Sequence, residues 1–242
     1  MNNTLCFDFG NTRKKVAHFQ GSELKEVVVL ENDSTEIILE LIHKFKPQKT
    51  ILSSVVHHNP AIEELLDAQT KFHKLNYLSK LPFAPTVGKP ETIGADRLAL
   101  SAAVVYFYPK QNNLVIALGS CITYNFINKE NEFLGGGISP GLEMRLKSLN
   151  NYTALLPLVK PDTNIPLIGY DTVTNITSGV ILGMAHEIDG FIDAYKLKFN
   201  NFNAHLTGGD TVFLAPHIKN KIFADTELIF KGLYAICEAN NQ

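Results

Sequence analysis

Hydrophobic and polar positions along the chain predict short strands that alternate with helices. Three β-rich runs, Thr4–Phe9, Lys15–Phe19 and Leu24–Leu30, open the sequence. Apolar residues then recur at helical spacing after Ser34, a residue type that caps helix N-termini. Thr50–Val56 returns to a β-rich pattern. Strands and helices that alternate in this way favour an α/β fold.

The same order of elements recurs about half a chain later. Leu114–Leu118 is an apolar run that ends in a glycine-hydroxyl pair, and two β-rich runs follow at Ile122–Ile127 and Glu132–Leu134. A glycine-rich segment, Gly135–Gly141, then leads into a helix. Such a diffuse repeat also arises by chance. If it is real, the chain consists of two similar αβ lobes that face each other across a phosphate-sized cleft.

Two of the strand ends carry glycine beside polar side chains. In Asp8–Lys15 the carboxylate is suited to a metal ion, and the N–H groups of the turn are suited to a phosphate. The second segment, Gly119–Thr123, offers N–H and hydroxyl groups in the same way. The alternative for both segments is a plain β-hairpin turn, in which the Asp-x-Gly-Asn pattern of the first is common.

Two further segments combine glycine with charged residues. The first, Gly94–Arg97, begins a helical stretch, so Asp96 either caps the helix or acts as a general base on a substrate hydroxyl, with Arg97 binding an anion. The second, Thr207–Asp210, follows the strand Phe202–Leu206. Its paired glycines permit close approach of a flat ring, and its aspartate alone would cap a short helix.

A long helix is expected over Thr172–Tyr195. Gly179 and Gly183 lie one turn apart in it, and this spacing predicts a close helix crossing, either inside the fold or between subunits.

Composition narrows the function classes. Of the 242 residues, 45% are apolar and 19% charged, and the net charge of −2 gives no electrostatic reason to expect nucleic-acid binding. The apolar runs are too short to cross a bilayer, and we expect no membrane partner. Asp8 interrupts any export signal, and the three cysteines form no CxxC pair. These features favour a reducing, cytoplasmic location.

Taken in order, these segments resemble the type III pantothenate kinases over nearly the whole chain. The resemblance is carried by Asp8-Phe9-Gly10-Asn11-Thr12, Gly94-Ala95-Asp96-Arg97, Gly119-Ser120-Cys121-Ile122-Thr123, Gly136–Gly141, Leu206–Asp210 and Leu228–Leu233. It implies duplicated actin-like (ribonuclease H-like) αβ lobes with an interlobe nucleotide cleft. An N-terminal lobe would cover residues 1–112, and a C-terminal lobe with the dimer helix would cover residues 113–242.

The implied activity is ATP-dependent phosphorylation of pantothenate to 4'-phosphopantothenate, the first step toward coenzyme A, with Mg²⁺ as cofactor. By resemblance, Asp96 accepts the proton, Arg97 binds the pantothenate carboxylate, and Asp8 lies near the Mg²⁺ that accompanies ATP. Thr172 reaches pantothenate in the partner subunit, which implies a homodimer. The remaining residues assigned to pantothenate are Gly94 and Ala95, and those assigned to ATP are Asp8, Phe9, Gly10, Asn11, Thr12, Arg13, Lys14, Lys15, Gly119, Ser120, Thr207, Gly208 and Gly209.

Four positions depart from the family pattern. Ala117 stands where the family has an aspartate that holds a monovalent cation, K⁺ or NH₄⁺, and an alanine side chain offers that cation no oxygen. Asn125 stands where aspartate is frequent, Val87 where tyrosine is frequent, and Asp171 where asparagine is usual.

These departures leave three readings open. The enzyme is active and needs no monovalent cation, or it obtains the charge elsewhere, with Lys89 and Lys147 as candidates. Alternatively, the chain is a catalytically weak regulatory homologue that binds nucleotide or pantothenate. A more distant reading is a kinase for another small hydroxylated substrate.

Overall fold

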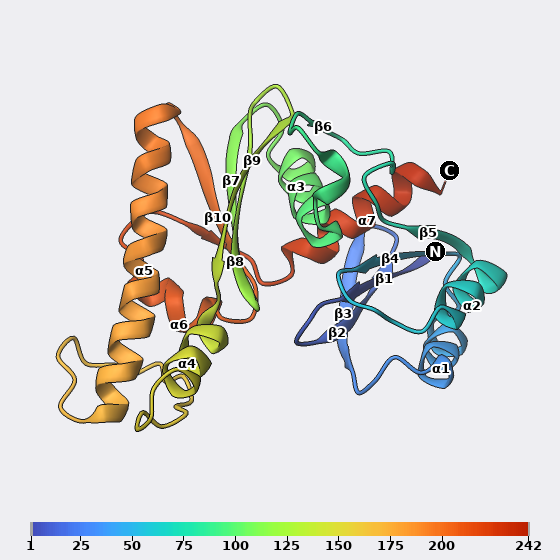
Figure 1. Ribbon diagram of the computed structural model, residues 1–242. Coiled ribbons are helices and arrows are strands. Elements are labelled where there is room, and N and C mark those ends of the chain that lie inside the picture. The colour runs from blue at the N-terminus through green and yellow to red at the C-terminus, as the bar shows by residue number, and fades with distance from the viewer. Residues whose placement is uncertain (1, 242) are drawn as a thin grey trace. The chain divides into compact units, whose positions relative to one another are not determined.

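The computed structural model describes residues 2–241, and the contacts within the chain divide them into two compact units (Figure 1). The first unit holds the residues up to Lys110, Glu130–Leu134, and those from Glu227 on. The second holds Gln111–Lys129 and Gly135–Thr226. This division differs from the sequence-based one, which placed every residue after 112 in the second lobe.

The first unit is built on a five-stranded sheet with the order β3-β2-β1-β4-β5. β1 pairs antiparallel with β2, and β2 with β3, whereas β4 runs parallel to β1 and β5 parallel to β4. The strands are β1 (Asn3–Phe9), β2 (Lys14–Gln20), β3 (Glu23–Leu30), β4 (Lys49–Ser54), β5 (Lys71–Lys74) and the short β6 (Ala84–Pro85). The helices are α1 (Thr35–Phe45), α2 (Ala61–Gln69), the 3₁₀ turn η1 (Pro90–Thr92), α3 (Ala95–Phe107) and α7 (Leu228–Asn240).

The second unit repeats this plan. Its strands are β7 (Asn112–Leu118), β8 (Cys121–Ile127), β9 (Glu132–Pro140), β10 (Phe202–Thr207) and β11 (Phe223–Ala224). Their order is β11-β10-β7-β8-β9, and the Glu132–Phe133 end of β9, which belongs with the first unit, pairs with β6. The helices are α4 (Leu142–Asn151), α5 (Thr172–Lys198), α6 (Thr211–Leu214) and the 3₁₀ turn η2 (Ala215–His217).

The two sheets have the same topology. In each, a first strand, β1 or β7, pairs antiparallel with the next strand in sequence and parallel with a later strand, β4 or β10. A last short strand, β5 or β11, extends the parallel side. The internal repeat predicted from the sequence is therefore confirmed, together with the duplicated α/β fold class.

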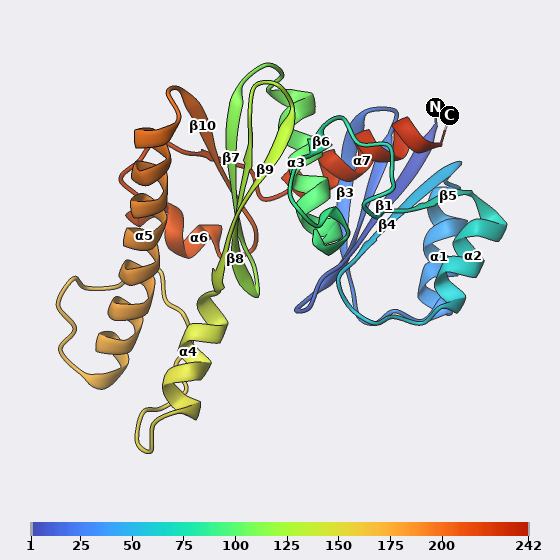
Figure 2. The same cartoon turned by 45° about the horizontal axis from the view of Figure 1, so that its top comes forward.

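Alternate residues of β1 face opposite sides of the first sheet. Phe7 and Phe9 join a core with residues of α1 and α2, including Ile38. Cys6 and Asp8 point to the other side, toward Cys237 of α7 and Asp96 of α3. Figure 2 shows α3 and α7 on this side of the sheet. A Cβ on Gly232 of α7 would lie only 1.9 Å from the backbone oxygen of Ala99 in α3. This close helix packing is the reason that the C-terminal residues join the first unit.

The strand expected over Glu132–Leu134 extends further than predicted, because the glycine-rich residues that follow, up to Pro140, continue β9. A Cβ on Gly136 would lie 1.8 Å from the backbone oxygen of Tyr124 in β8. Glycine is needed here for the close approach of two strands.

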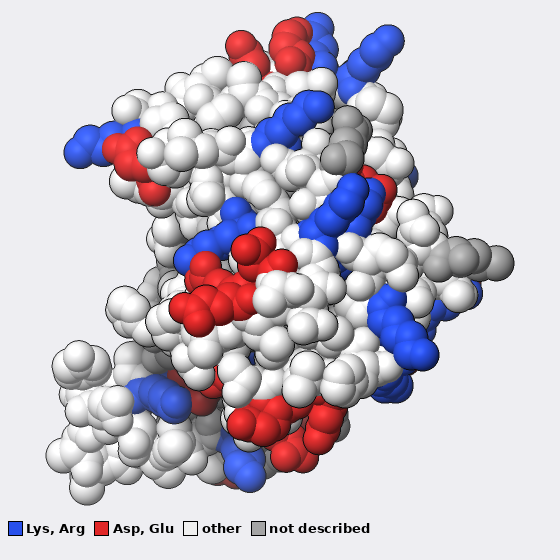
Figure 3. Space-filling view, turned by 90° about the vertical axis from the view of Figure 1, so that its right-hand side faces the viewer, with Lys and Arg blue, Asp and Glu red and all other residues white. Residues whose placement is uncertain are grey.

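Charged residues of both signs are scattered over the face of the molecule drawn in Figure 3, and no broad field of one sign covers that face. This distribution agrees with the net charge of −2. Within residues 2–241, no helix has the length and apolar character needed to cross a bilayer.

Candidate functional site

Two carboxylates of the first unit, Asp8 at the end of β1 and Asp96 in the first turn of α3, interact electrostatically. Burial and the charge of Asp96 raise the pKa of Asp8 to about 7, although Lys15 acts in the opposite direction. Burial also raises the pKa of Asp96, against a hydrogen bond from the backbone N–H of Arg97 and the Arg97 charge. The pair therefore concentrates negative charge in a poorly solvated place, where a cation would be favourable.

The segment after Asp8 is a tight hairpin turn. The N–H of Gly10 donates to the backbone oxygen of Arg13 over 3.1 Å, and Asn11, Thr12 and Arg13 are exposed. The turn thus presents polar groups to solvent while it joins β1 to β2. Lys14 lies in an ion pair with Asp33 over 2.8 Å, with its Nζ 5.7 Å from the centre of the Phe9 ring.

Asp96 folds back over the start of α3. Its Oδ1 accepts a hydrogen bond from the backbone N–H of Arg97 over 2.9 Å. A Cβ on Gly94, the N-cap residue, would lie 2.5 Å from the same Oδ1, so glycine leaves room for the carboxylate. The guanidinium carbon of Arg97 lies 5.5 Å from the centre of the Phe133 ring. Gly94, Ala95, Asp96 and Arg97 therefore form one compact helix start.

Three separate segments of the second unit meet at the end of β7. The N–H of Gly119 donates to the backbone oxygen of Cys121, and the N–H of Gly141 donates to that of Ser120, each over 3.1 Å. A Cβ on Gly141 would lie 2.2 Å from the Gly119 oxygen, and one on Gly208 would lie 2.2 Å from the Leu118 oxygen. The Gly119–Thr123 and Thr207–Asp210 segments, both assigned to ATP by the resemblance, are therefore neighbours.

The Thr207–Asp210 segment connects β10 to α6. Gly208 has a φ of +103°, a conformation that favours glycine, and Thr211 Oγ1 donates to its backbone oxygen over 2.8 Å. Asp210 is the N-cap residue of α6, and Gly209 is exposed.

The segment that leads to Gly141 is fixed by a carboxylate that the sequence analysis missed. Glu187 of α5 accepts hydrogen bonds from Tyr124 over 3.0 Å and from Ser139 over 2.5 Å, and it forms an ion pair with Arg145. Burial acts to raise the pKa of Glu187, but these donors together lower it. Arg145 Nε also donates to the Pro140 oxygen over 2.8 Å.

The positions that depart from the family pattern have ordinary structural surroundings. Ala117 pairs with Thr123 on one side and Thr207 on the other. Asn125 is buried, and its Nδ2 donates to the Val115 oxygen over 3.3 Å. The carboxylate of Asp171 caps α5 by accepting from the N–H of Thr174 over 2.8 Å.

The two lysines considered as substitute charges are both exposed. Lys147 pairs with Glu143 on α4 over 2.7 Å, and Lys89 precedes η1. Val87 is half-buried in the segment between β6 and η1.

Thr172 lies at an apolar cavity between α4 and α5. The cavity has a volume of about 600 Å³ and is lined by Leu149, Leu156, Thr172, Asn175, Ile176, Gly179 and Val180. A Cβ on Gly179 or Gly183 would meet no atom within 4 Å, so the close helix crossing predicted there does not occur within the described chain. Several large apolar side chains nearby are exposed, among them Leu155 at 92% and Tyr170 at 81%.

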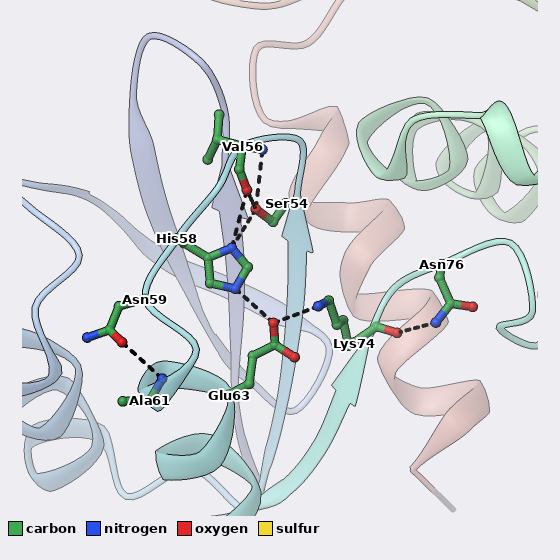
Figure 4. Close-up of polar contacts among 8 residues, drawn as sticks. All are labelled: Ser54, Val56, His58, Asn59, Ala61, Glu63, Lys74 and Asn76. Atoms are coloured by element: carbon green, nitrogen blue, oxygen red, sulfur yellow. Dashed lines mark hydrogen bonds and ion pairs between the residues drawn. The ribbon is translucent and has the colours of Figure 1, made fainter.

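A polar network fixes the turn that follows β4 in the first unit (Figure 4). The Oγ of Ser54 donates to the backbone oxygen of Val56 over 2.9 Å and is bonded to Nδ1 of His58, also over 2.9 Å. His58 Nε2 contacts Glu63 over 2.9 Å, and Lys74 donates to the same carboxylate oxygen over 2.6 Å. The backbone N–H of Val55 donates to the Phe9 oxygen, which continues the pairing of β4 with β1 by one residue.

The side chains around Asp8 suit Mg²⁺ better than a metal held by protein alone. Among residues 2–241, no group of three or more histidine, cysteine, aspartate or glutamate side chains is placed to hold a metal ion. Mg²⁺ is typically bound through one or two carboxylates, with phosphate oxygens and water completing its shell. Asp8, a single buried carboxylate at the end of β1, fits that requirement.

Comparisons with known proteins match most of the chain. The family model for type III pantothenate kinase matches residues 4–194. The type III pantothenate kinases of Flavobacterium johnsoniae and Christiangramia forsetii are 42% and 43% identical to this chain, over 95% and 98% of both sequences.

Two solved structures share the fold. A conserved putative Baf family transcriptional activator from Campylobacter jejuni has a TM-score of 0.63 at 24% identity and covers 98% of both chains. An activator of 2-hydroxyisocaproyl-CoA dehydratase from Clostridium difficile has a TM-score of 0.54 at 11% identity and covers 99% of this chain and 94% of its own. The sequence matches, which span nearly the whole length, decide the family: the chain is a member of the type III pantothenate kinases.

Proposed function

We propose that this chain transfers the γ-phosphoryl group of ATP to the primary hydroxyl of pantothenate, the first step toward coenzyme A. The observation that carries the proposal is the pair formed by Asp8 and Asp96, two carboxylates with raised pKa values on neighbouring elements. Phosphoryl transfer depends on placing the reactants and balancing phosphate charge. A cation-binding carboxylate beside a proton-accepting one meets both needs.

In the first unit, Asp8 would hold the Mg²⁺ that accompanies the nucleotide. When bound, this ion neutralises charge on the phosphate oxygens. The exposed residues Asn11, Thr12 and Arg13 offer polar groups to the phosphates. Lys15 adds positive charge close to Asp8. Lys14 is less suited to this role, since Asp33 already pairs with it.

In the second unit, Gly119 and Ser120 would bind phosphate oxygens, and Thr207–Gly209 would face the adenosine. The contacts of Gly141 and Gly208 with the end of β7 support this assignment, because they hold both loops in one arrangement. Preformed loops lose little conformational freedom when a ligand binds.

Asp96 would act as the general base. It would hold the pantothenate hydroxyl and accept its proton late in the transfer, and a carboxylate with a raised pKa accepts a proton more readily. Arg97 carries a planar guanidinium suited to a bidentate contact with the pantothenate carboxylate. Gly94 and Ala95 complete the helix start against which the substrate would lie.

We further propose a homodimer in which Thr172 reaches the partner's substrate. Exposed glycines on α5 and exposed apolar residues near Thr172 support a subunit contact on this side of the second unit. Leucine and tyrosine side chains that are more than four-fifths exposed are typical of surfaces that another protein covers.

A monovalent cation site at Ala117 is not proposed, since the only oxygen that this residue offers is its backbone carbonyl. Turnover without K⁺ or NH₄⁺ is the expected behaviour. A charge supplied by Lys147 is less favoured, because Glu143 already pairs with it.

The test is an assay of the purified protein with ATP, Mg²⁺ and pantothenate, with and without K⁺ or NH₄⁺. Mass spectrometry detects phosphorylated pantothenate directly, and the release of ADP gives the rate. Formation of the product in all salts supports the proposal. Binding of ATP or pantothenate without product would favour a regulatory role instead.

A further inference from the structure

The two adjacent serines at the end of β4 differ in their hydrogen bonding. Successive residues of a strand point to opposite faces of a sheet. Ser54 is bonded to Val56 and His58 (Figure 4). Ser53 is fully buried, and its Oγ has no hydrogen-bond partner in the described part of the chain. An unpaired buried hydroxyl costs free energy, and a partner gained in another state of the protein would recover that cost.

Ser53 faces the side of the sheet on which α3 and α7 pack. Leu52, its neighbour, points the other way into the core formed with α1 and α2. Lys49 shares the face of Ser53 and forms an ion pair with Glu238 of α7 over 2.9 Å. Val55 also shares it and lies 3.8 Å from the Cβ position of Gly94 at the start of α3.

The residue beside Ser53 on this face is Asp8. The two are direct partners in the parallel pairing of β1 with β4. Neighbouring strands lie about 5 Å apart, and paired residues present their side chains to the same face. A rotation of the Ser53 side chain therefore brings its hydroxyl within reach of the Asp8 carboxylate.

We propose that Ser53 is a positioning residue for Asp8. Its hydroxyl donates to one oxygen of the Asp8 carboxylate when the divalent cation of the nucleotide is bound, and the other oxygen then faces the cation. This inference rests on the proposed function, in which Asp8 meets that cation. Carboxylates that bind metal ions are commonly held by such hydrogen bonds, and their loss typically lowers metal affinity by about 10- to 100-fold.

The experiment titrates Mg²⁺ into the full chain at saturating ADP and follows the thermal unfolding midpoint, a readout that requires no turnover. Ser53→Ala removes only the unpaired hydroxyl. We expect it to leave the melting temperature of the metal-free protein unchanged or higher. The Mg²⁺ midpoint, which is the Mg²⁺ concentration that gives half of the maximal rise in melting temperature, should increase by about 10-fold or more. Ser53→Thr keeps a hydroxyl and should retain the wild-type Mg²⁺ midpoint.

Ser54→Ala is the matched control on the opposite face of the sheet. It breaks the hydrogen bonds to Val56 and His58, so we expect a lower melting temperature with an unchanged Mg²⁺ midpoint. Equal Mg²⁺ midpoints for wild type and Ser53→Ala would overturn the inference and leave the proposed function standing. A wild-type protein that Mg²⁺ and ADP do not stabilise would overturn both.

Discussion

Gly141 lies so close to Gly119 that a Cβ atom on Gly141 would be 2.2 Å from the Gly119 backbone oxygen. The N–H of Gly141 also donates to the Ser120 oxygen over 3.1 Å. Gly141, the N-cap residue of α4, thus packs directly against the backbone of the turn between β7 and β8. Because both contacts are with backbone atoms, no side-chain rotation can make room for a larger residue.

Gly141→Ala should therefore displace the turn of Gly119 and Ser120. We expect a weaker affinity for ATP, by about 10-fold or more, with a smaller effect on pantothenate, because phosphate contacts depend on sub-ångström placement of the N–H groups. Isothermal calorimetry with a non-hydrolysable ATP analogue measures the change. Gly190→Ala is the control: its Cβ would meet no atom within 4 Å, and in a helix it should stabilise the fold by ~1 kcal/mol. Equal affinities for the two variants would contradict this account.

Asp8→Asn should stabilise the cation-free protein while it abolishes turnover. The pKa of Asp8 is about 7 in the folded state, above its ordinary 3.8. Between these values the folded state keeps a proton that the unfolded state loses, so this group makes stability fall as pH rises through that window. Asparagine carries no charge. At pH 8 the free energy of unfolding of Asp8→Asn should therefore exceed that of wild type by on the order of a few kcal/mol.

Thermal unfolding of Asp8→Asn and wild type at pH 8 without Mg²⁺ shows whether the substitution raises the melting temperature, as predicted. Asp33→Asn provides the comparison, since a hydrogen bond from Lys14 lowers the pKa of that carboxyl and its removal should not stabilise the fold. A lower melting temperature for Asp8→Asn than for wild type would show that the carboxylate is not strained by burial.

Burial of His205 should make the folded protein less stable in mild acid. The His205 side chain is 2% exposed, and burial lowers its pKa from 6.5 to about 4, with Asp225 opposing the shift. Between these values the unfolded state binds a proton that the folded state excludes, so stability falls as pH drops from 6.5 toward 4, by up to ~3 kcal/mol. Urea unfolding of wild type and His205→Gln at pH 7.5 and 4.5 measures the difference. His43→Gln, at an exposed position, should keep the wild-type dependence; a wild-type pH dependence in His205→Gln would refute the assignment.

Much of the fold could be predicted from the sequence because the residues that begin helices and form turns act locally. Ser34 accepts a hydrogen bond from Ile37 and begins α1, as its residue type indicated. Gly94 and Asp96 begin α3 as predicted. The topology of the second unit followed from the repeat, since similar patterns of strand and turn fold to the same sheet order.

What the sequence did not reveal depends on contacts between distant segments. The extension of β9 through three glycines is set by the approach of Tyr124, and α7 joins the first unit through its contact with Ala99. Glu187 was missed because its partners, Tyr124, Ser139 and Arg145, come from three other elements. The scarcity of arginine, with only three in the chain, was the one available signal toward Arg145.

The most direct test of the central claim compares Asp96→Asn with the wild-type protein. Pantothenate-dependent release of ADP gives turnover, and calorimetry with a non-hydrolysable ATP analogue gives nucleotide affinity. A general base typically contributes about 10²- to 10⁴-fold to the rate. We therefore predict that Asp96→Asn binds the analogue as wild type does and loses at least about 100-fold in turnover. Wild-type turnover in Asp96→Asn would contradict the role of Asp96 as proton acceptor.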